Sequence, residues 1–393
     1  MKKCIQFIIV LFFLTFVVGC STQETVEVTE TQIQYDWMVG ESPISSQRTG
    51  LFRSGLCIVD HEVTSSGTYF VYNDYILYSD DNSDSVIKLC GRADCTHNNT
   101  DCNAYIEDGS QISCYEGYLY AVTGNLSEEE CKLIRMNLDG SNRIEMLDLL
   151  EFAKENGGDY VDCSLITQGY LVFSTYYWAQ QEDDSFSGTW LEYYTYKLDG
   201  SAGDPKAVDS PGWYLYNCGD VILTYLSEAE NGGEYGSFWN WDIENDTLTY
   251  LCDHPGTPGY FDEENGYYYR EGAVRCLNYQ TQTETTLIDT GLEGDYYALF
   301  LPDCIVVVSR DKVSEGADDN LYIYNWAYEL VDSIKLDYPK DDELRMEYTI
   351  IAETAERIVL TDSFQGIPRY YIEKAELGTG EIKVYAYNLP DFQ

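Results

Sequence analysis

The sequence predicts an all-β chain that folds as a β-propeller, and three observations support this prediction. Aromatic residues are abundant, with 37 tyrosines, 14 phenylalanines and 7 tryptophans, and aromatic side chains favour the pleated, half-buried surfaces of sheets. Only 9 prolines interrupt the chain, and a helical pattern is confined to one short segment, Glu145 to Asn156. A hairpin pattern also recurs at intervals typical of a four-stranded blade.

Each repeat begins with an apolar strand, a tight turn and an aromatic-rich strand. The turns centre on Asp74, Gly117, Gly169, Gly219, Gly266, Asp303 and Glu356. Successive turns are roughly 37 to 53 residues apart, the span of one propeller blade. The seven units predict a seven-bladed propeller, with six or eight blades as the alternatives because the copies have diverged.

The second half of each repeat is a strand that ends in another turn, followed by one more strand. Residues 132–141 and 193–201 match closely, and both end in Asp-Gly-Ser. Asp-Gly pairs supply the positive backbone angles that tight hairpins need. A stretch near Leu51 to Val63 is expected to add a strand that closes the ring. A closed ring leaves no long exposed sheet edge.

The first twenty residues resemble a lipoprotein export signal. A basic start precedes an apolar run from Ile5 to Val18, which is shorter than the roughly 20 residues of a membrane-spanning helix. Val17-Val18-Gly19-Cys20 then resembles a lipobox, which predicts that residues 1–19 are a signal peptide and that Cys20 carries lipid. A plain signal peptide or an uncleaved anchor is the alternative. Residues 20–48 are expected to be the lipidated N-terminus and a flexible tether, and residues 49–393 the propeller.

The charge of the chain excludes some classes of partner. Its 68 acidic and 23 basic residues give a net charge of −45. A surface with this much negative charge repels the phosphate backbones of nucleic acids and anionic lipid headgroups. No nucleic-acid partner is therefore expected, and the lipid on Cys20 is expected to be the membrane contact. The sequence therefore predicts a body anchored at the extracytoplasmic face of the cell membrane.

Four residues form the one group with evident chemistry: Cys90, Cys95, His97 and Cys102. Three thiolates and an imidazole can close a tetrahedral zinc site, although the usual Cys-x2-Cys spacing is missing. Two of the cysteines can instead form a disulfide in an oxidising compartment, or all three can remain free thiols. Thirteen cysteines less Cys4 and Cys20 leave eleven, so at least one is unpaired within the chain. Mid-strand cysteines are expected to be small buried hydrophobes; these are Cys114, Cys131 and Cys276.

Other chemical patterns are weaker. Asp80, Asn82 and Asp84 imitate the start of a calcium loop, but Ser85 and Gly91 stand where an EF-hand needs Gly and Glu, so an acidic turn is expected. The sequence contains no nucleophile elbow, His-Glu-x-x-His helix or phosphate-binding glycine loop. No catalytic residue is therefore assigned.

Two resemblances extend this interpretation. Residues 136–142 are similar to the strand and turn of YWTD-type propellers, as in the low-density-lipoprotein-receptor family. Leu89-Cys90, Cys95-Thr96-His97 and Cys102-Asn103-Ala104 resemble uncharacterised propeller lipoproteins of Gram-positive, Firmicutes-type bacteria. Both resemblances imply a propeller, and neither implies an established activity.

The resulting prediction is a non-enzymatic propeller that binds a ligand or protein, with an envelope protein or a glycan as the partner and no cofactor. Two alternatives remain. One is a carbohydrate-active enzyme with paired carboxylates at the propeller mouth, where Trp178, Trp190 or Trp239 could stack on a sugar. The other is a metal-binding module, with zinc as the metal, at Cys90, Cys95, His97 and Cys102.

Overall fold

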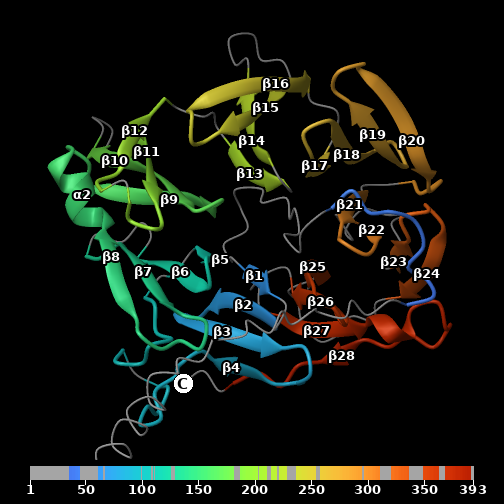
Figure 1. Cartoon of the computed structure of the whole chain (residues 1–393), viewed down its shortest axis with the longest axis horizontal. Coiled ribbons are helices and arrows are strands. Elements are labelled where there is room, and N and C mark those ends of the chain that lie inside the picture. Colours follow the sequence, from blue (N-terminus) through green and yellow to red (C-terminus); the bar gives the residue numbers. More distant parts are fainter. Residues whose placement is uncertain are drawn as a thin grey trace, which may run out of the picture. The chain divides into compact units, whose positions relative to one another are not determined.

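The computed structural model describes residues 35–44 and 61–390, apart from gaps at 65–66, 99, 108, 110, 125–128, 181–185, 202, 210–213, 219–220, 228–235, 254–256, 294–295, 310–319, 336–347 and 363–367. The described residues form seven antiparallel sheets of four strands. Figure 1 shows these sheets following one another in chain order around a common centre. The prediction of an all-β propeller is confirmed.

Every sheet takes four strands in sequence order. The first contains β1 His61–Thr64, β2 Gly67–Tyr72, β3 Tyr75–Asp80 and β4 Val86–Lys88. The second contains β5 Ile112–Tyr115, β6 Tyr118–Thr123, β7 Lys132–Asn137 and β8 Ile144–Asp148. The third contains β9 Tyr160–Thr167, β10 Tyr170–Gln180, β11 Phe186–Lys197 and β12 Lys206–Val208. The fourth contains β13 Tyr214–Cys218, β14 Val221–Ser227, β15 Gly236–Asp242 and β16 Thr247–Asp253.

The remaining three sheets repeat the arrangement. The fifth contains β17 Thr257–Phe261, β18 Asn265–Arg270, β19 Ala273–Asn278 and β20 Thr283–Asp289. The sixth contains β21 Tyr296–Phe300, β22 Ile305–Ser309, β23 Asn320–Tyr324 and β24 Leu330–Lys335. The seventh contains β25 Tyr348–Glu353, β26 Arg357–Asp362, β27 Pro368–Glu373 and β28 Tyr385–Ala386. The first strands of neighbouring sheets contact one another, so they lie nearest the centre.

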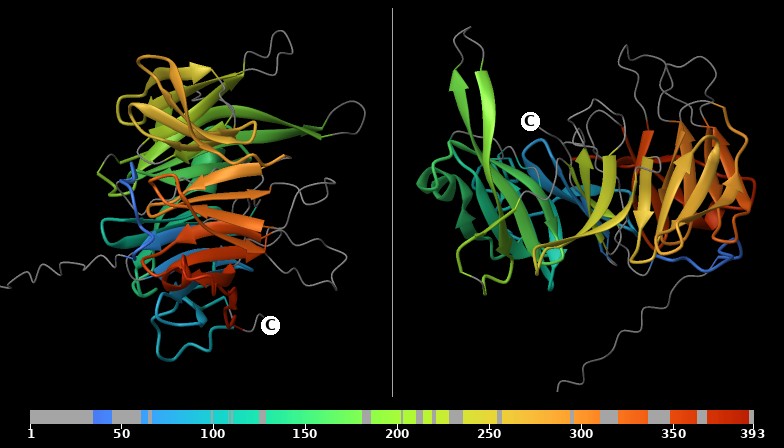
Figure 2. Two further views of the ribbon diagram at one scale, coloured as in Figure 1. Left: turned by 90° about the vertical axis from the view of Figure 1, so that its right-hand side faces the viewer. Right: turned by 90° about the horizontal axis from the view of Figure 1, so that it is seen from above.

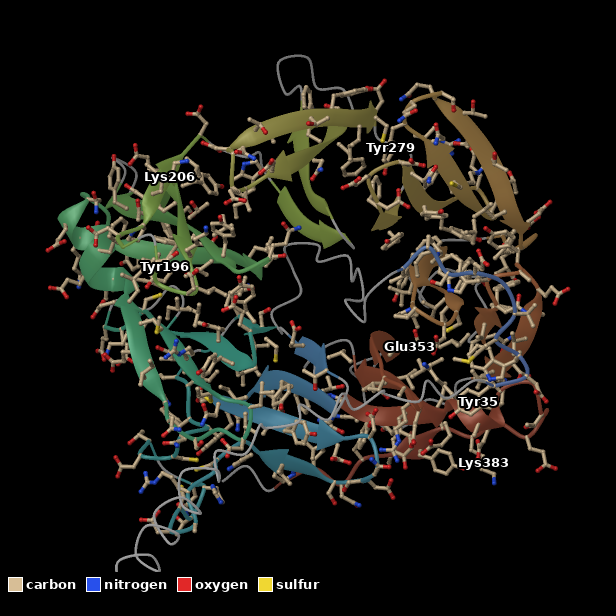
Figure 3. All side chains as sticks on the ribbon, in the orientation of Figure 1. Tyr35, Tyr196, Lys206, Tyr279, Glu353 and Lys383 are labelled. Atoms are coloured by element: carbon tan, nitrogen blue, oxygen red, sulfur yellow. The ribbon has the colours of Figure 1, made fainter. Side chains whose placement is uncertain are left out.

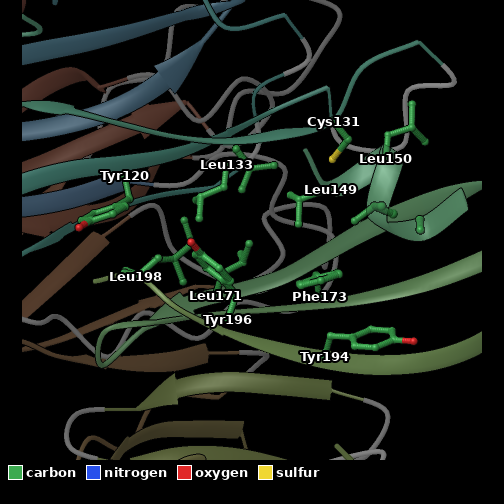
Figure 4. Packing of buried hydrophobic residues seen from close by; sticks show 14 residues of the cluster. Tyr120, Cys131, Leu133, Leu149, Leu150, Leu171, Phe173, Tyr194, Tyr196 and Leu198 are labelled. Carbon is green, nitrogen blue, oxygen red and sulfur yellow. The ribbon is translucent and has the colours of Figure 1, made fainter. Parts of the chain in front are cut away.

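Hydrophobic clusters fill the seams between blades. Between the second and third blades, Leu133 packs with Leu171 and Phe173 (Figure 4). Val122 belongs to the same cluster. Each facing strand contributes alternate residues to this cluster, such as Leu171 and Phe173 of β10, because successive side chains of a strand point to opposite faces. Figure 2 shows the hairpin of β10 and β11 extending past the neighbouring sheets.

The predicted helix is shorter than expected. The helix α2 spans Leu149–Glu155, whereas Ile144–Asp148 forms the outer strand β8. The Asp148 side chain accepts a hydrogen bond from the Glu151 backbone N–H at 2.8 Å and so caps the helix. Pairing with β7 therefore decides the structure of these residues against their helical pattern. A 3-10 turn, η2, follows at Lys374–Glu376.

The stretch expected to close the ring is described only in part. Residues 51–60 lie outside the described residues, and His61–Thr64 forms β1 of the first sheet, which contacts β25 of the last. The first and last blades also meet through side chains and a C-terminal segment. Asn388 pairs with Ser85, and Arg357 Nη1 donates to the Ser83 carbonyl at 2.8 Å. Asp84 accepts from the Tyr371 hydroxyl at 2.6 Å.

Residues 35–44, which the sequence places in the tether, pack against the ring. Trp37 is buried in the cluster of the sixth and seventh blades, and its Nε1 donates to the Lys374 carbonyl at 3.0 Å. The Val39 carbonyl accepts from the Ala327 backbone N–H at 2.8 Å. The compact unit accordingly begins at Tyr35. No helix among the described residues is long and apolar enough to cross a membrane.

Candidate metal centre

The loop from Leu89 to Ile106, here called the metal loop, links the first and second blades. Its two ends meet at one residue of β3. The Leu89 backbone N–H donates to the Ile76 carbonyl at 2.9 Å, and the Ile76 N–H donates to the Ala104 carbonyl at 2.8 Å. This double contact brings Cys90, next to Leu89, close to Cys102, near Ala104.

The four predicted residues come together in this loop. The ligand atoms of Cys90, Cys95, His97 and Cys102 all lie within 4.8 Å of one another. A Zn²⁺ ion with bonds of about 2.0–2.3 Å in a tetrahedron would separate its ligand atoms by about 3.5–3.8 Å. Cys102 Sγ and His97 Nδ1 are already 3.7 Å apart. The side chains can therefore surround one ion after small movements.

The three cysteines of the metal loop are free thiols in this structure, one of the three states that the sequence leaves open. Cys102 is buried, while Cys90, Cys95 and His97 are half-buried. A disulfide would bring two sulfur atoms to about 2.05 Å and would leave the third thiol without its partner. The arrangement present keeps all four donor atoms directed at one another.

Backbone N–H groups of the loop support the sulfur atoms. The His97 N–H donates to Cys95 Sγ at 3.4 Å. The backbone N–H groups of Arg92 and Asn103 act to lower the pKa of Cys90, and that of Ala104 acts to lower the pKa of Cys102. Hydrogen bonds of this kind stabilise the thiolate form that binds metals.

These contacts shift the acidities of the thiols in opposite directions. Burial alone would raise the pKa of Cys90, but hydrogen bonds from backbone N–H groups and neighbouring thiols hold its pKa below the ordinary value. Burial raises the pKa of Cys102 to about 12, and the adjacent Cys95 and Cys90 add to the increase. Negative charge on one sulfur therefore opposes charge on the next, a penalty that a divalent cation would offset.

Basic residues surround the loop in an otherwise acidic chain. Lys88 Nζ donates to the His97 carbonyl at 2.9 Å and lies 3.9 Å from the centre of the Tyr75 ring. Arg92 Nη1 donates to the Asp101 carbonyl at 2.6 Å. His97 has a positive φ of 56°, an uncommon conformation for a residue other than glycine. The Lys88 contact holds the carbonyl of this residue in place.

The other predicted site residues are not part of this centre. Cys20 lies outside the described residues, and so do the side chains of Trp178 and Trp190. Trp239 lies on β15, where its Nε1 donates to Ser237 Oγ at 2.7 Å and its ring packs edge-on against Tyr250. The mid-strand cysteines Cys114 and Cys276 are half-buried, and Cys131 is buried just before β7.

The calcium-like sequence forms a turn between β3 and β4. Asp80 Oδ1 accepts from the Asn82 backbone N–H at 2.8 Å, as in an ordinary acidic turn. Asp84, however, faces Arg357 of the last blade, with Oδ1 3.4 Å from Nη2. Its carboxylate is therefore used to close the ring.

A buried ionic cluster at the seam of the sixth and seventh blades was not predicted. Lys374 Nζ lies 2.5 Å from Asp303 Oδ2 and 2.8 Å from Glu353 Oε1, and Lys374 is 1% exposed. Figure 3 labels Glu353, the last residue of β25. Burial alone would lower the pKa of Lys374, but the charges of Glu353 and Asp303 raise it. The sequence carries no clear signal for it, since Lys374 follows a strand, Pro368–Glu373, that itself contains Arg369 and Glu373.

This cluster bears on carbohydrate chemistry. Asp303 and Glu353 are two carboxylates close together, as a glycoside hydrolase needs. Lys374 lies between them, and Glu353 is 2% exposed. Both carboxylates are therefore paired with one lysine, and Glu353 is buried in the seam.

Comparisons with known proteins add no function. No family model matches the chain, and no curated protein does either. Among solved structures, the β-propeller domain of the Trilobed protease from Pyrococcus furiosus is 15% identical, with a TM-score of 0.41 over 72% of this chain and 88% of that one. An oligogalacturonate lyase in complex with manganese is 12% identical, with a TM-score of 0.38 over 66% of this chain and 74% of that one. The metal centre is therefore interpreted from its own geometry.

Proposed function

We propose that this protein binds one zinc ion through Cys90, Cys95, His97 and Cys102. The observation that supports the proposal is the convergence of four donor atoms within 4.8 Å of one another. Three sulfurs and one imidazole nitrogen form a donor set that zinc prefers, whereas calcium and magnesium prefer oxygen. The metal loop can hold such an ion without rearrangement of the blades.

A structural role for the ion follows from the number of ligands. Four protein ligands complete a tetrahedron, whereas catalytic zinc sites keep one position for water or substrate. The ligands all belong to one loop, so the ion would fix that loop without a disulfide. This role agrees with a propeller that acts as a rigid binding frame.

The test is metal analysis of the full chain purified under reducing conditions. We expect about one zinc per chain, and loss of the ion after Cys95→Ser or His97→Asn, because each change removes one ligand. Cys276→Ser is the matched control, since Cys276 is a half-buried cysteine of β19 outside the cluster. Zinc that is absent from the wild-type chain, or retained equally by all variants, would refute the proposal.

We also propose that the propeller is displayed outside the cell membrane by lipid on Cys20 and binds its partner without catalysis. The lipobox-like Val17-Val18-Gly19-Cys20 supports the anchor. The ion pairs of Lys374 with both Asp303 and Glu353 argue against these two carboxylates as the catalytic pair of a glycoside hydrolase. Labelling of cells with an alkyne fatty acid should tag the wild-type protein and not Cys20→Ala. Equal labelling of both would contradict the anchor.

A further inference from the structure

The metal loop contacts the second blade as well as the first. Asn103 Nδ2 donates to the Gly140 carbonyl, in the turn between β7 and β8, at 2.8 Å. The two backbones approach so closely that a Cβ on Gly140 would lie 2.5 Å from the Leu89 carbonyl oxygen, and one on Gly91 2.9 Å from that of Asp139. Glycine is therefore needed at Gly91, which follows Cys90 in the chain, and at Gly140, in the turn of the second blade that faces the loop.

Arg143, which follows the same turn, extends this contact. Its Nη1 donates to the carbonyls of Tyr105 and Asn103, the latter at 3.4 Å. These two residues flank Ala104. Asn103 directly follows Cys102 in the chain. Arg143 therefore holds the short segment that positions Cys102.

Charge gives Arg143 a second role. Three thiolates around one Zn²⁺ carry a net charge of −1, and the chain has 68 acidic residues against 23 basic ones. Lys88, Arg92 and Arg143 nevertheless all donate to carbonyls of this loop. Residues around the ligands that orient them and balance their charge set the strength of a metal site.

We propose that the metal centre clamps the first and second blades together, with Arg143 and Asn103 as positioning residues. This inference rests on the proposed zinc site. It adds that the ion stabilises the contact between the first and second blades. Coupling between two sites is reciprocal. Zinc should therefore stabilise the contact between the turn at residues 138–145 and the loop. The factor by which zinc strengthens this contact equals the factor by which the contact strengthens zinc binding, so loss of the Arg143 contact should weaken zinc binding.

The experiment measures zinc affinity of the full chain by competition with a chromophoric chelator. Arg143→Met and Asn103→Ala are each expected to weaken binding about ten- to a hundred-fold, the usual effect of removing a residue that orients metal ligands. Arg143→Lys should recover part of the loss, since it keeps the charge but not the fork of two donors. Arg135→Met is the control. Arg135 lies on β7 of the same blade, over the Tyr118 ring.

Two further readouts separate positioning from general damage. The Co²⁺-substituted Arg143→Met protein should keep the sulfur-to-cobalt absorption of a three-thiolate site, because no ligand is lost. Zinc should slow amide hydrogen exchange at residues 138–145 in the wild-type chain and not in Arg143→Met. Both results would show that the second blade responds to the ion through this contact.

The outcomes distinguish this inference from the proposed function. If the wild-type chain binds zinc and both Arg143→Met and Asn103→Ala bind it equally well, the clamp is wrong while the zinc site stands. Unchanged hydrogen exchange at residues 138–145 on zinc addition also overturns the clamp. If the wild-type chain binds no zinc, the proposed function is wrong and the clamp is overturned with it. Asn103→Ala keeps the test decisive if Arg143→Met does not fold.

Discussion

Asp81 offers a quantitative test of how the ring is closed. It lies in the turn between β3 and β4 and is 8% exposed. Burial raises the pKa of Asp81 to about 6, against the opposing hydrogen bond from Thr354 and charge of Arg357, both of the last blade. The unfolded chain should titrate near the ordinary value of 3.8. The folded state therefore binds this proton more tightly.

The sign of the pH dependence follows from this difference. Between about pH 3.8 and pH 6 the folded state holds the Asp81 proton and the unfolded state has lost it, so the free energy of unfolding falls as pH rises. A difference of about 2.2 pKa units at 1.36 kcal/mol each gives about 3 kcal/mol. That stability is present in full below the unfolded pKa and is lost by about pH 6.

Asp81→Asn removes the charge and keeps the shape. The variant should therefore be more stable than the wild type at pH 7.5 by up to about 3 kcal/mol, and nearly equal to it at pH 4. With about 2.1 cal/mol/K of unfolding entropy per residue over about 360 residues, this corresponds to about 4 °C in melting temperature.

The assay is thermal unfolding of both proteins from pH 4 to pH 8, in which other titrating groups cancel in the difference. Asp199→Asn is the control. Asp199 lies in an exposed turn, where hydrogen bonds from Ser201 hold its pKa below the ordinary value, so its replacement should not stabilise the protein at neutral pH. An Asp81→Asn protein no more stable than wild type at pH 7.5 would refute the reasoning.

Three further predictions concern the seams and the metal. Trp37→Ala should lower the free energy of unfolding by about 3–5 kcal/mol in denaturant titration, because it removes a buried ring from the sixth and seventh blades; a loss below 1 kcal/mol would contradict that packing. Lys374→Met should lower the free energy of unfolding by about 3–5 kcal/mol, since it leaves the Glu353 carboxylate buried without its cation. Adding Glu353→Gln to this variant should recover part of the lost stability. Additive losses in the double variant would argue against the ion pair. Chelation of zinc should make Cys90 and Cys95 react with maleimide, as mass spectrometry would show, and unchanged labelling would exclude thiol protection by the ion.

Repeats that depend on local pattern were predicted well. The strand at 132–137 and its Asp-Gly turn appear as expected, because alternating side chains and positive backbone angles are properties of short segments. The turn predicted at Gly219 lies outside the described residues. Gly266 lies within β18 instead of a turn, since the preceding turn is made by Asp262, whose side chain caps the backbone N–H groups of Glu264 and Asn265.

The candidate donor residues were predicted and their arrangement was not. Cysteine and histidine spacing identified Cys90, Cys95, His97 and Cys102 but left disulfide, zinc and free thiols open. The convergence of their side chains depends on the double hydrogen bond at Ile76, which folds the loop back on β3. It depends also on Arg143, which is 41 residues beyond Cys102 in the chain. No local spacing carries that contact.

The repeating strands, the donor types of the metal loop and the acidic charge can be read from the order and kind of residues alone. The contacts that join the first and last blades, such as that of Arg357 with Asp84, and the packing of Trp37 against the last blade appear only in the folded protein. The same is true of the convergence of Cys90, Cys95, His97 and Cys102. These features join residues far apart in the chain, and their partners are brought together only when the blades pack against one another.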